Sequence, residues 1–282
     1  MPIQPHALRG HDFAPTTQRY DARDAIIYAL GVGLGQDTCN PDDLAFLDER
    51  QLSVLPSYAV TLTSPGMWIR DAAFGVDFAK LVHFEQMAWF SNPLPASADV
   101  VGDARILSLT DRGEGKGAVL VLERTISDAV SRTLYCRLHQ TLLLRGDGGF
   151  GGDPTPLQPS IIPAVDAKLT ARMRVSPRAA LLYRLSGDWN PLHLDPLMAK
   201  QAGFERPILH GLASYAMAGV AVSRACDRDP GSIGALGCRF SGFIYPGDTL
   251  DVRVWSTGDT SAVFQAFVGD RKVLDQGQII WK

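Results

Sequence analysis

The chain has 282 residues, of which 46% are hydrophobic and 20% are charged, a size that suits one large domain or two of ordinary size. Its formal net charge of -3 excludes broad electrostatic attraction to nucleic acid or to anionic lipid. The four cysteines, Cys39, Cys136, Cys226 and Cys238, form no Cys-x-x-Cys pair that would indicate a zinc site or a redox dithiol. With no signal sequence or membrane-spanning run in the pattern, we expect a soluble cytoplasmic protein without nucleic-acid or membrane partners.

The N-terminal half is predicted to hold one early helix followed by three strands. Residues 20–33 have a helical pattern that begins near two aspartates and ends near two glycines, and we place this helix before the first strand. Between Tyr58 and His83, the Ser-Pro-Gly sequence at 64–66 excludes a second long helix. The predicted strands, apolar runs bounded by turn residues, are 99–110, 117–127 and 131–144.

A glycine-rich and then proline-rich segment separates the two halves. Glycines crowd residues 146–152, and Pro154, Pro156, Pro159 and Pro163 follow. Such a composition indicates a linker. The glycines are either a flexible spacer or a loop whose bare backbone lies against a ligand. We therefore divide the chain into an N-terminal unit, 1–152, and a C-terminal unit, 153–282.

The C-terminal half has a clearer pattern, one long buried helix followed by an antiparallel meander. Residues 210–226 are rich in Ala, Gly, Leu and Met with few polar residues, which predicts the helix. A helix against an antiparallel sheet makes an α+β unit, and the first half repeats much of this element order. The predicted strands, separated by Gly-Asp turns, are 235–244, 249–256, 262–268 and 272–281.

The segment 183–196 carries the most chemical information. Because proline disfavours helical geometry in the residue before it, Asn190-Pro191 interrupts the helix and places Asp188 and His193 on an irregular loop. Asp195 then caps a short helix that ends before Gly203. Taken alone, an aspartate and a histidine in a loop indicate a turn cap and a packed imidazole more often than catalysis. Together they also suit acid/base chemistry.

The sequence Tyr-Arg-Leu-Ser-Gly-Asp-Trp-Asn-Pro-Leu-His at 183–193 resembles the signature of the MaoC-like (R)-specific 2-enoyl-CoA hydratases, the hydratase 2 family that includes the hydratase unit of peroxisomal multifunctional enzyme type 2. Further similar segments lie at 23–33, 83–86, 111–113, 148–152 and 203–212, so the resemblance spans nearly the whole chain. It implies a double hot-dog fold with two antiparallel sheets and a long central helix in the C-terminal half only. An acyl chain would then occupy the space in the N-terminal half that a central helix would otherwise fill.

The resemblance also implies roles for individual residues. Asp188 and His193 would flank a catalytic water, Asn190 would help to orient it, and the backbone N–H of Gly211 would bind the thioester oxygen. The family commonly has glycine at the position of Phe84, which puts the shape of the acyl or pantetheine channel in question. The residues expected to line the CoA and acyl path are His83, Phe84, Arg112, Ser186, Gly187, Trp189, Pro191, Leu192 and Phe240.

The implied activity is the reversible hydration of trans-2-enoyl-CoA to (R)-3-hydroxyacyl-CoA by a homodimer that needs no cofactor and no metal. A metal at His193 and Asp195 is not expected, because no third ligand is near in the sequence. His210 is interpreted as a hydrogen-bonding anchor before the long helix. The first alternative is still an enzyme: a dehydratase that runs the reverse reaction, or one acting on acyl carrier protein conjugates or on branched or branched dicarboxylic acyl-CoA. The second is a non-catalytic acyl-CoA-binding hot-dog protein.

Overall fold

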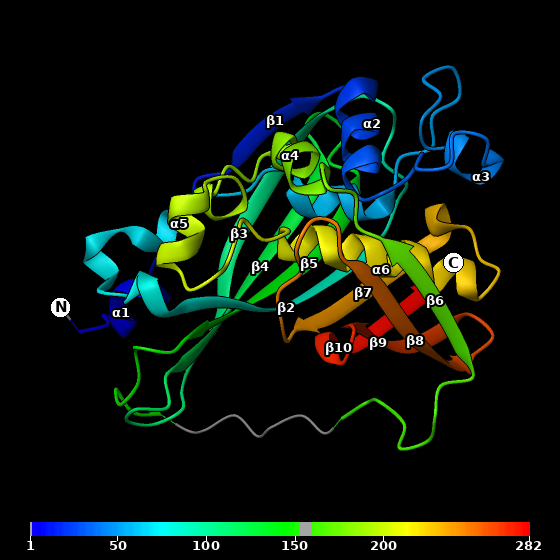
Figure 1. Ribbon diagram of the computed structural model, residues 1–282. Helices are drawn as coiled ribbons and strands as arrows, with labels where there is room; N and C mark the ends of the chain where they lie inside the picture. Colours follow the sequence, from blue (N-terminus) through cyan, green and yellow to red (C-terminus); the bar gives the residue numbers. More distant parts are fainter. Residues whose placement is uncertain (1, 153–159) are drawn as a thin grey trace.

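Ten antiparallel strands form one continuous sheet in the computed structural model, which describes residues 2–152 and 160–282 (Figure 1). The strand order is β1-β3-β4-β5-β2-β7-β10-β9-β8-β6. The strands are β1 (Thr16–Tyr20), β2 (Leu81–Phe90), β3 (Ala98–Asp111), β4 (Ala118–Asp128), β5 (Leu134–Leu144), β6 (Leu169–Arg174), β7 (Ile233–Phe240), β8 (Thr249–Gly258), β9 (Ser261–Val268) and β10 (Arg271–Trp281). The α-helices are α1 (Pro5–Arg9), α2 (Ala22–Gly31), α3 (Pro41–Leu44), α4 (Ala179–Tyr183), α5 (Pro196–Gln201) and α6 (Gly211–Ala225). The short 3-10 helices are η1 (Pro56–Thr61), η2 (Trp68–Arg70), η3 (Ala72–Phe74), η4 (Phe78–Lys80), η5 (Arg184–Ser186), η6 (Pro191–His193) and η7 (Pro230–Ser232).

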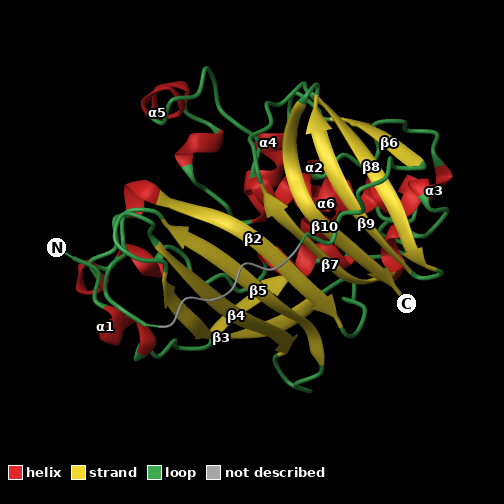
Figure 2. Ribbon diagram, turned by 90° about the horizontal axis from the view of Figure 1, so that it is seen from below, coloured by secondary structure: helices red, strands yellow, loops and turns green. Residues whose placement is uncertain are grey.

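The two halves of the sheet are mirror images in strand order, with β2 and β7 at the centre and β1 and β6 at the edges. Figure 2 shows β2 to β5 in one half of the sheet and β6 to β10 in the other. This repeat confirms the double hot-dog arrangement. The two sheets that we expected are, however, joined into one, because β2 pairs with β7 and sets Met87 opposite Gly237. The pairing satisfies backbone groups that two free sheet edges would leave exposed. A side chain at Gly237 would collide with Met87, so the small residue permits this seam.

Helix α6 is the predicted long helix, and it lies against the C-terminal half of the sheet (Figure 1). All of its residues from Ala213 to Ser223 are buried, as the apolar sequence predicts. Small residues allow a close approach to the strands: a Cβ added to Gly219 would lie 2.8 Å from a methyl carbon of Leu236. Among the residues that the structure describes, no helix has the length and apolarity needed to cross a membrane.

Helix α2 matches the helix predicted over 20–33, and a reciprocal capping box between Asp21 and Asp24 sets its start. Its expected place before the first strand is wrong, because β1 precedes it and pairs with β3. Strand β1 was not predicted because it has only five residues, of which Tyr20 alone is buried.

Strands β2 and β6 were also not predicted. The first carries His83, Glu85 and Gln86, a polar run that we interpreted as a short amphipathic segment.

No long helix covers the N-terminal half of the sheet in its described residues, where α2 is the longest helix. Helix η1 and a group of tyrosine rings pack there instead. The Tyr20 and Tyr28 rings lie 5.3 and 5.0 Å from that of Tyr58, measured between centroids. The N-terminal half therefore differs from the C-terminal half mainly in what covers the inner face of its strands.

The glycine-rich segment after β5 binds a carboxylate of the chain itself. The backbone N–H groups of Gly149 and Gly151 donate to Asp111 at 2.9 and 2.6 Å, and Gly113 donates to it at 2.8 Å. These hydrogen bonds, with that of Gly149 the strongest influence, lower the pKa of Asp111. The predicted linker prolines at 154, 156 and 159 and the boundary at 152/153 involve residues outside the described part of the chain.

Candidate active site

The loop between α4 and α5 has the irregular course that the sequence predicts. Helix η5 ends at Gly187, whose φ of 110° suits glycine, and Pro191 starts η6 after the extended residue Asn190. The loop then turns into α5, where the Asp195 carboxylate accepts the N–H of Leu197 at 2.8 Å as an N-cap. Two short helices thus hold the segment from 187 to 190 between fixed ends.

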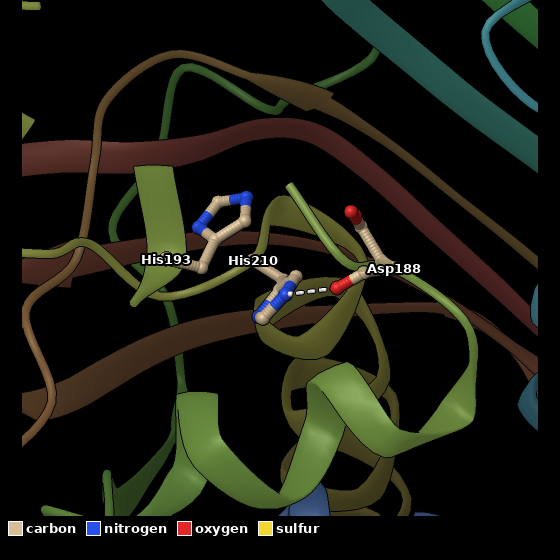
Figure 3. Close-up of side chains that lie close together, drawn as sticks. All are labelled: Asp188, His193 and His210. Atoms are coloured by element: carbon tan, nitrogen blue, oxygen red, sulfur yellow. Dashed lines mark hydrogen bonds between the residues drawn. The ribbon is translucent and has the colours of Figure 1, made fainter. Parts of the chain in front are cut away.

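Asp188, His193 and His210 converge at one place (Figure 3). One ligand-type atom of each lies within 4.8 Å of the others. Both imidazoles are buried, with 8% and 1% of their surface exposed, whereas Asp188 is exposed. The group therefore lies at a boundary, with two rings in the interior and a carboxylate that solvent or a ligand can reach.

The position of His193 determines which of its nitrogens can act as a base. Nδ1 lies 2.9 Å from the carbonyl oxygen of Ile208. Because a carbonyl only accepts, Nδ1 carries the hydrogen and donates it, which leaves a lone pair on Nε2 in the neutral ring. Burial lowers the pKa of His193, so the ring is neutral at neutral pH. His193 is therefore a proton acceptor of defined orientation.

His210 is a hydrogen-bonding anchor, as the sequence analysis expects. Its Nε2 donates to the backbone carbonyl of Asp188 at 3.2 Å, and its ring stacks on His193 with centroids 3.8 Å apart and planes 29° apart. Burial, and next the nearby His193, lower the pKa of His210 to about 4. A neutral His210 therefore fixes the backbone of Asp188 and the ring of His193 together.

Asp188 and Asn190 also shape the loop by local hydrogen bonds. Oδ1 of Asp188 accepts the N–H of Asn190 at 3.2 Å, and Oδ1 of Asn190 accepts the N–H of Leu192 at 3.1 Å. The amide oxygen of Asn190 thus caps η6, and its amide nitrogen is the group left to orient a water. Asp188 keeps its second carboxylate oxygen for chemistry.

Gly211 is exposed and is the first residue of α6. Backbone N–H groups in the first turn of a helix have no acceptor within the helix, and the helix dipole favours negative charge there. A Cβ at Gly211 would lie 3.3 Å from the ring of Phe240, so Phe240 packs directly on this residue. Phe240 in turn meets the ring of His83 with centroids 4.8 Å apart. The structure thus places Gly211, Phe240 and His83 side by side.

The other residues predicted to line the substrate path lie in different parts of the structure. The ring of Phe84 lies under the guanidinium of Arg239 at 4.7 Å, and Trp189, 57% exposed, lies under that of Arg184 at 4.4 Å. Ser186, Gly187, Pro191 and Leu192 follow the course of the loop itself. Arg112 is exposed in the turn after β3, next to the glycine-rich segment.

Sequence spacing did not indicate that His210 would join Asp188 and His193. The expectation that no metal binds rested on the lack of a third ligand near His193, yet the fold supplies His210 as a third group. Its Nε2 is already used as a donor to Asp188. The absence of a metal stays a prediction. The partner of His193, the carbonyl of Ile208, was also not predictable, because it depends on how 204–210 returns to the loop.

Comparisons with known proteins cover both halves. The MFE-2 hydratase 2 N-terminal domain matches residues 18–146, and the MaoC like domain matches residues 162–277. The chain is 36% identical to the peroxisomal enoyl-CoA hydratase 2 of Arabidopsis thaliana, over 94% of this chain and 90% of the relative. It is 37% identical to 3-hydroxyacyl-thioester dehydratase Y of Mycobacterium tuberculosis, over 99% and 98%. The crystal structure of a MaoC-like dehydratase from Phytophthora capsici is similar with a TM-score of 0.84 at 30% identity, covering 98% of both chains. The chain belongs to the MaoC-like hydratase 2 family.

Proposed function

We propose that this enzyme catalyses the reversible hydration of trans-2-enoyl-CoA to (R)-3-hydroxyacyl-CoA, with Asp188 and His193 as its acid/base pair. The observation that carries the assignment of residues is the free lone pair on Nε2 of His193, oriented by the bond to Ile208 and close to the exposed carboxylate of Asp188. A water held between these two groups would meet a base on each side.

The reaction then proceeds with a balanced transfer of atoms. The pair takes a proton from the water as its oxygen bonds to the β-carbon, and the π electrons move toward the thioester oxygen. A proton is returned to the α-carbon, so one water is consumed and the enzyme ends in its starting protonation state. Asn190 helps to orient the water, and the N–H of Gly211 stabilises the enolate oxygen at the start of α6.

The residues proposed to contact the substrate are inferred from the family resemblance and from where their side chains lie. Phe240 packs on Gly211 and His83 contacts Phe240, which suits binding of the acyl part near the thioester. Arg112 is exposed and free to meet a phosphate of CoA. The loop residues Ser186, Gly187, Trp189, Pro191 and Leu192, and Phe84 on β2, would line the rest of the path.

Direction, carrier and assembly are part of the same proposal. Dehydration is the reverse of hydration, and one similar protein is named a dehydratase. We propose a CoA carrier, a homodimer, a cytoplasmic location and no cofactor, since water and the thioester are the only reactants. The four cysteines are all free, which suits a reducing compartment.

Asp188→Asn tests the assignment of the acid/base pair. Because the amide cannot take a proton, we expect kcat for a trans-2-enoyl-CoA to fall by about 10²- to 10⁴-fold, measured by loss of the enoyl absorbance. Asp229→Asn is the matched control, since Asp229 makes the same kind of bond to the N–H two residues on, at Gly231. Equal rates for wild type and Asp188→Asn would favour a non-catalytic acyl-CoA-binding protein. Chiral analysis of the 3-hydroxyacyl product checks the (R) assignment.

A further inference from the structure

Asp111, the last residue of β3, is a buried carboxylate that binds backbone N–H groups from two separate segments. Only 7% of its surface is exposed. Oδ1 accepts the N–H groups of Gly113 and Gly149 at 2.8 and 2.9 Å, and Oδ2 accepts that of Gly151 at 2.6 Å. An aspartate at a turn ordinarily accepts an N–H two residues further on, and only the Gly113 bond is of this local kind. The other two bonds join β3 to residues 38 and 40 positions further along the chain.

The glycine-rich segment packs against the turn between β3 and β4 through its backbone. A Cβ added to Gly148 would collide with the carbonyl oxygen of Gly113 and would lie 2.9 Å from that of Gly117. The turn is closed by the N–H of Arg112, which donates to the carbonyl of Gly117 at 3.0 Å. The next N–H along the chain, that of Gly113, donates to Asp111. The backbone of Arg112 is therefore held on both sides.

Three exposed cations, Arg112, Lys116 and Arg145, lie at this turn. A Cβ added to Gly117, the residue after Lys116, would lie 3.0 Å from Cα of Arg145. Among the described residues, none of the three side chains has an ion pair, a hydrogen bond or a ring contact. The Asp111 carboxylate is bound by N–H groups and takes up none of these charges. The three cations therefore remain available to an anionic ligand.

The turn and His83 lie at the same end of the sheet. One row of paired residues crosses four strands on a single face: Leu109, Leu120, Leu142 and His83. Asp111 is two residues past Leu109 on β3 and lies on the same face. Three strand spacings of about 4.8 Å and two residues of about 3.3 Å each place Asp111 roughly 15 Å from His83.

We propose that Asp111 is a positioning residue for CoA, because it fixes the turn from which Arg112 binds a phosphate of the nucleotide. This inference rests on the proposed function, in which CoA is the carrier and the thioester lies at Gly211. His83 contacts Phe240, which packs on Gly211. The separation between His83 and the turn leaves room for an extended pantetheine arm between the thioester and the phosphates. The two other cations at the turn add to the attraction for a phosphate.

A purely structural role for Asp111 would be to hold the glycine-rich segment on the sheet. Loss of that support would lower the Tm and would slow the reaction with every thioester alike. Positioning of Arg112 predicts instead a weaker affinity that is confined to substrates that carry the nucleotide.

The test compares trans-2-hexenoyl-CoA with the pantetheine thioester of the same acid, which lacks the nucleotide and every phosphate. In the wild type we expect a lower KM for the CoA substrate. Asp111→Asn replaces one acceptor oxygen by an amide nitrogen that only donates, so at least one of the bonds to the glycine-rich segment is lost. We expect KM for the CoA substrate to rise by about tenfold, while kcat and the KM for the pantetheine substrate change by less than about twofold.

Arg112→Gln should raise KM for the CoA substrate by about 10- to 100-fold, with the same selectivity, because a charge-assisted bond to phosphate is lost. The double variant should have the KM of Arg112→Gln alone, since Asp111 acts through the arginine. Asp128→Asn is the matched control. Asp128 ends β4 at the opposite end from this turn, and it also accepts two N–H groups, those of Val130 and Ser131 at 3.0 and 2.7 Å. Its loss should leave both KM values unchanged.

The outcomes separate the two proposals. An equal rise in KM for both substrates, or a lower kcat for both together with a lowered Tm, would assign Asp111 to structure alone. Additive effects in the double variant would show that Asp111 does not act through Arg112. Equal KM values for the two substrates in the wild type would overturn the nucleotide site and leave the hydratase intact. If the wild type hydrates neither substrate, the proposed function itself fails, and this inference fails with it.

Discussion

The N-terminal and C-terminal halves share one strand order but differ in what lies against their strands. In the C-terminal half, α6 fills the inner face and presents Gly211 and His210 at its start. In the N-terminal half, η1 and a group of tyrosines lie over the strands. There the half-buried His83 and the buried Arg124 each have a buried nitrogen with no hydrogen-bond partner among the described residues. The comparison teaches that one copy of the fold supports acid/base chemistry while the other copy supplies a differently shaped surface for the rest of the substrate.

Acidification should destabilise both halves, and this is the largest effect that we expect. The pKa of His83 and of His210 is lowered to about 4 in the folded chain, mainly by burial, from 6.5. Between pH 6.5 and 4 the unfolded chain therefore binds more protons, so stability is full above about 6.5 and is lost as the pH falls. Each pKa unit corresponds to about 1.4 kcal/mol.

Urea unfolding at a series of pH values measures this loss. The free energy of unfolding should depend less on pH in His83→Phe, which removes the imidazole of the N-terminal half. The same should hold for His210→Phe, which removes that of the C-terminal half. A stability that does not change from pH 7 to 4.5 would contradict the burial of both imidazoles as neutral groups.

Gly211→Pro tests whether the backbone N–H at the start of α6 takes part in catalysis. The N-terminal half has no long helix of this kind among its described residues. Proline is favoured at the first helical position, and His210 already has φ -59° and ψ 135°, which a following proline allows. Only the N–H is lost, so we expect kcat to fall by about 10²- to 10³-fold relative to Gly211→Ala. The alanine variant is matched, because it also brings a Cβ against Phe240. The same kcat in both variants would remove this N–H from the mechanism.

His210 should contribute less than Gly211, because it acts through its neighbours. His210→Phe keeps a ring against His193 but loses the hydrogen bond to Asp188, whereas His210→Gln keeps an N–H donor but loses the stacked ring. We expect kcat to fall by roughly fivefold in each, from the loss of one contact of about 1 kcal/mol. The pH profile of kcat/KM should keep its shape. A shifted profile would show that His210 transfers protons itself.

Phe84→Gly should have the smallest effect on kcat. It tests whether this residue of the N-terminal half lines the acyl or pantetheine channel. Phe84 packs on Arg239 rather than on the Asp188 group. We expect kcat for a short enoyl-CoA to change by less than about threefold, since van der Waals packing and a cation–π contact are lost without loss of an acid or base. Rates over short, medium and long enoyl-CoAs measure any change in preference. An unchanged preference would remove Phe84 from the channel.

The elements that the sequence predicted well are those set by local patterns. The turns between β7 and β10, the apolar residues of α6, the start of α2 near two aspartates and the cap at Asp195 all depend on a few neighbouring residues, so they can be inferred without the fold. The loop 183–196 was placed for the same reason, because Asn190-Pro191 forbids a continuous helix whatever surrounds it.

Tertiary structure decided the features that depend on distant partners. Strand β2 was missed because its polar residues are tolerated only where β5 and β7 pair with it on both sides, and the same pairing joins the two expected sheets. His210 meets Asp188 and His193 across the turn of the chain between α5 and α6, and Arg124 is buried because η1 folds over β4. By itself the sequence determined the residue types and the local turns. Long-range strand pairing and burial then decided which of these residues lie together and which of them are neutral.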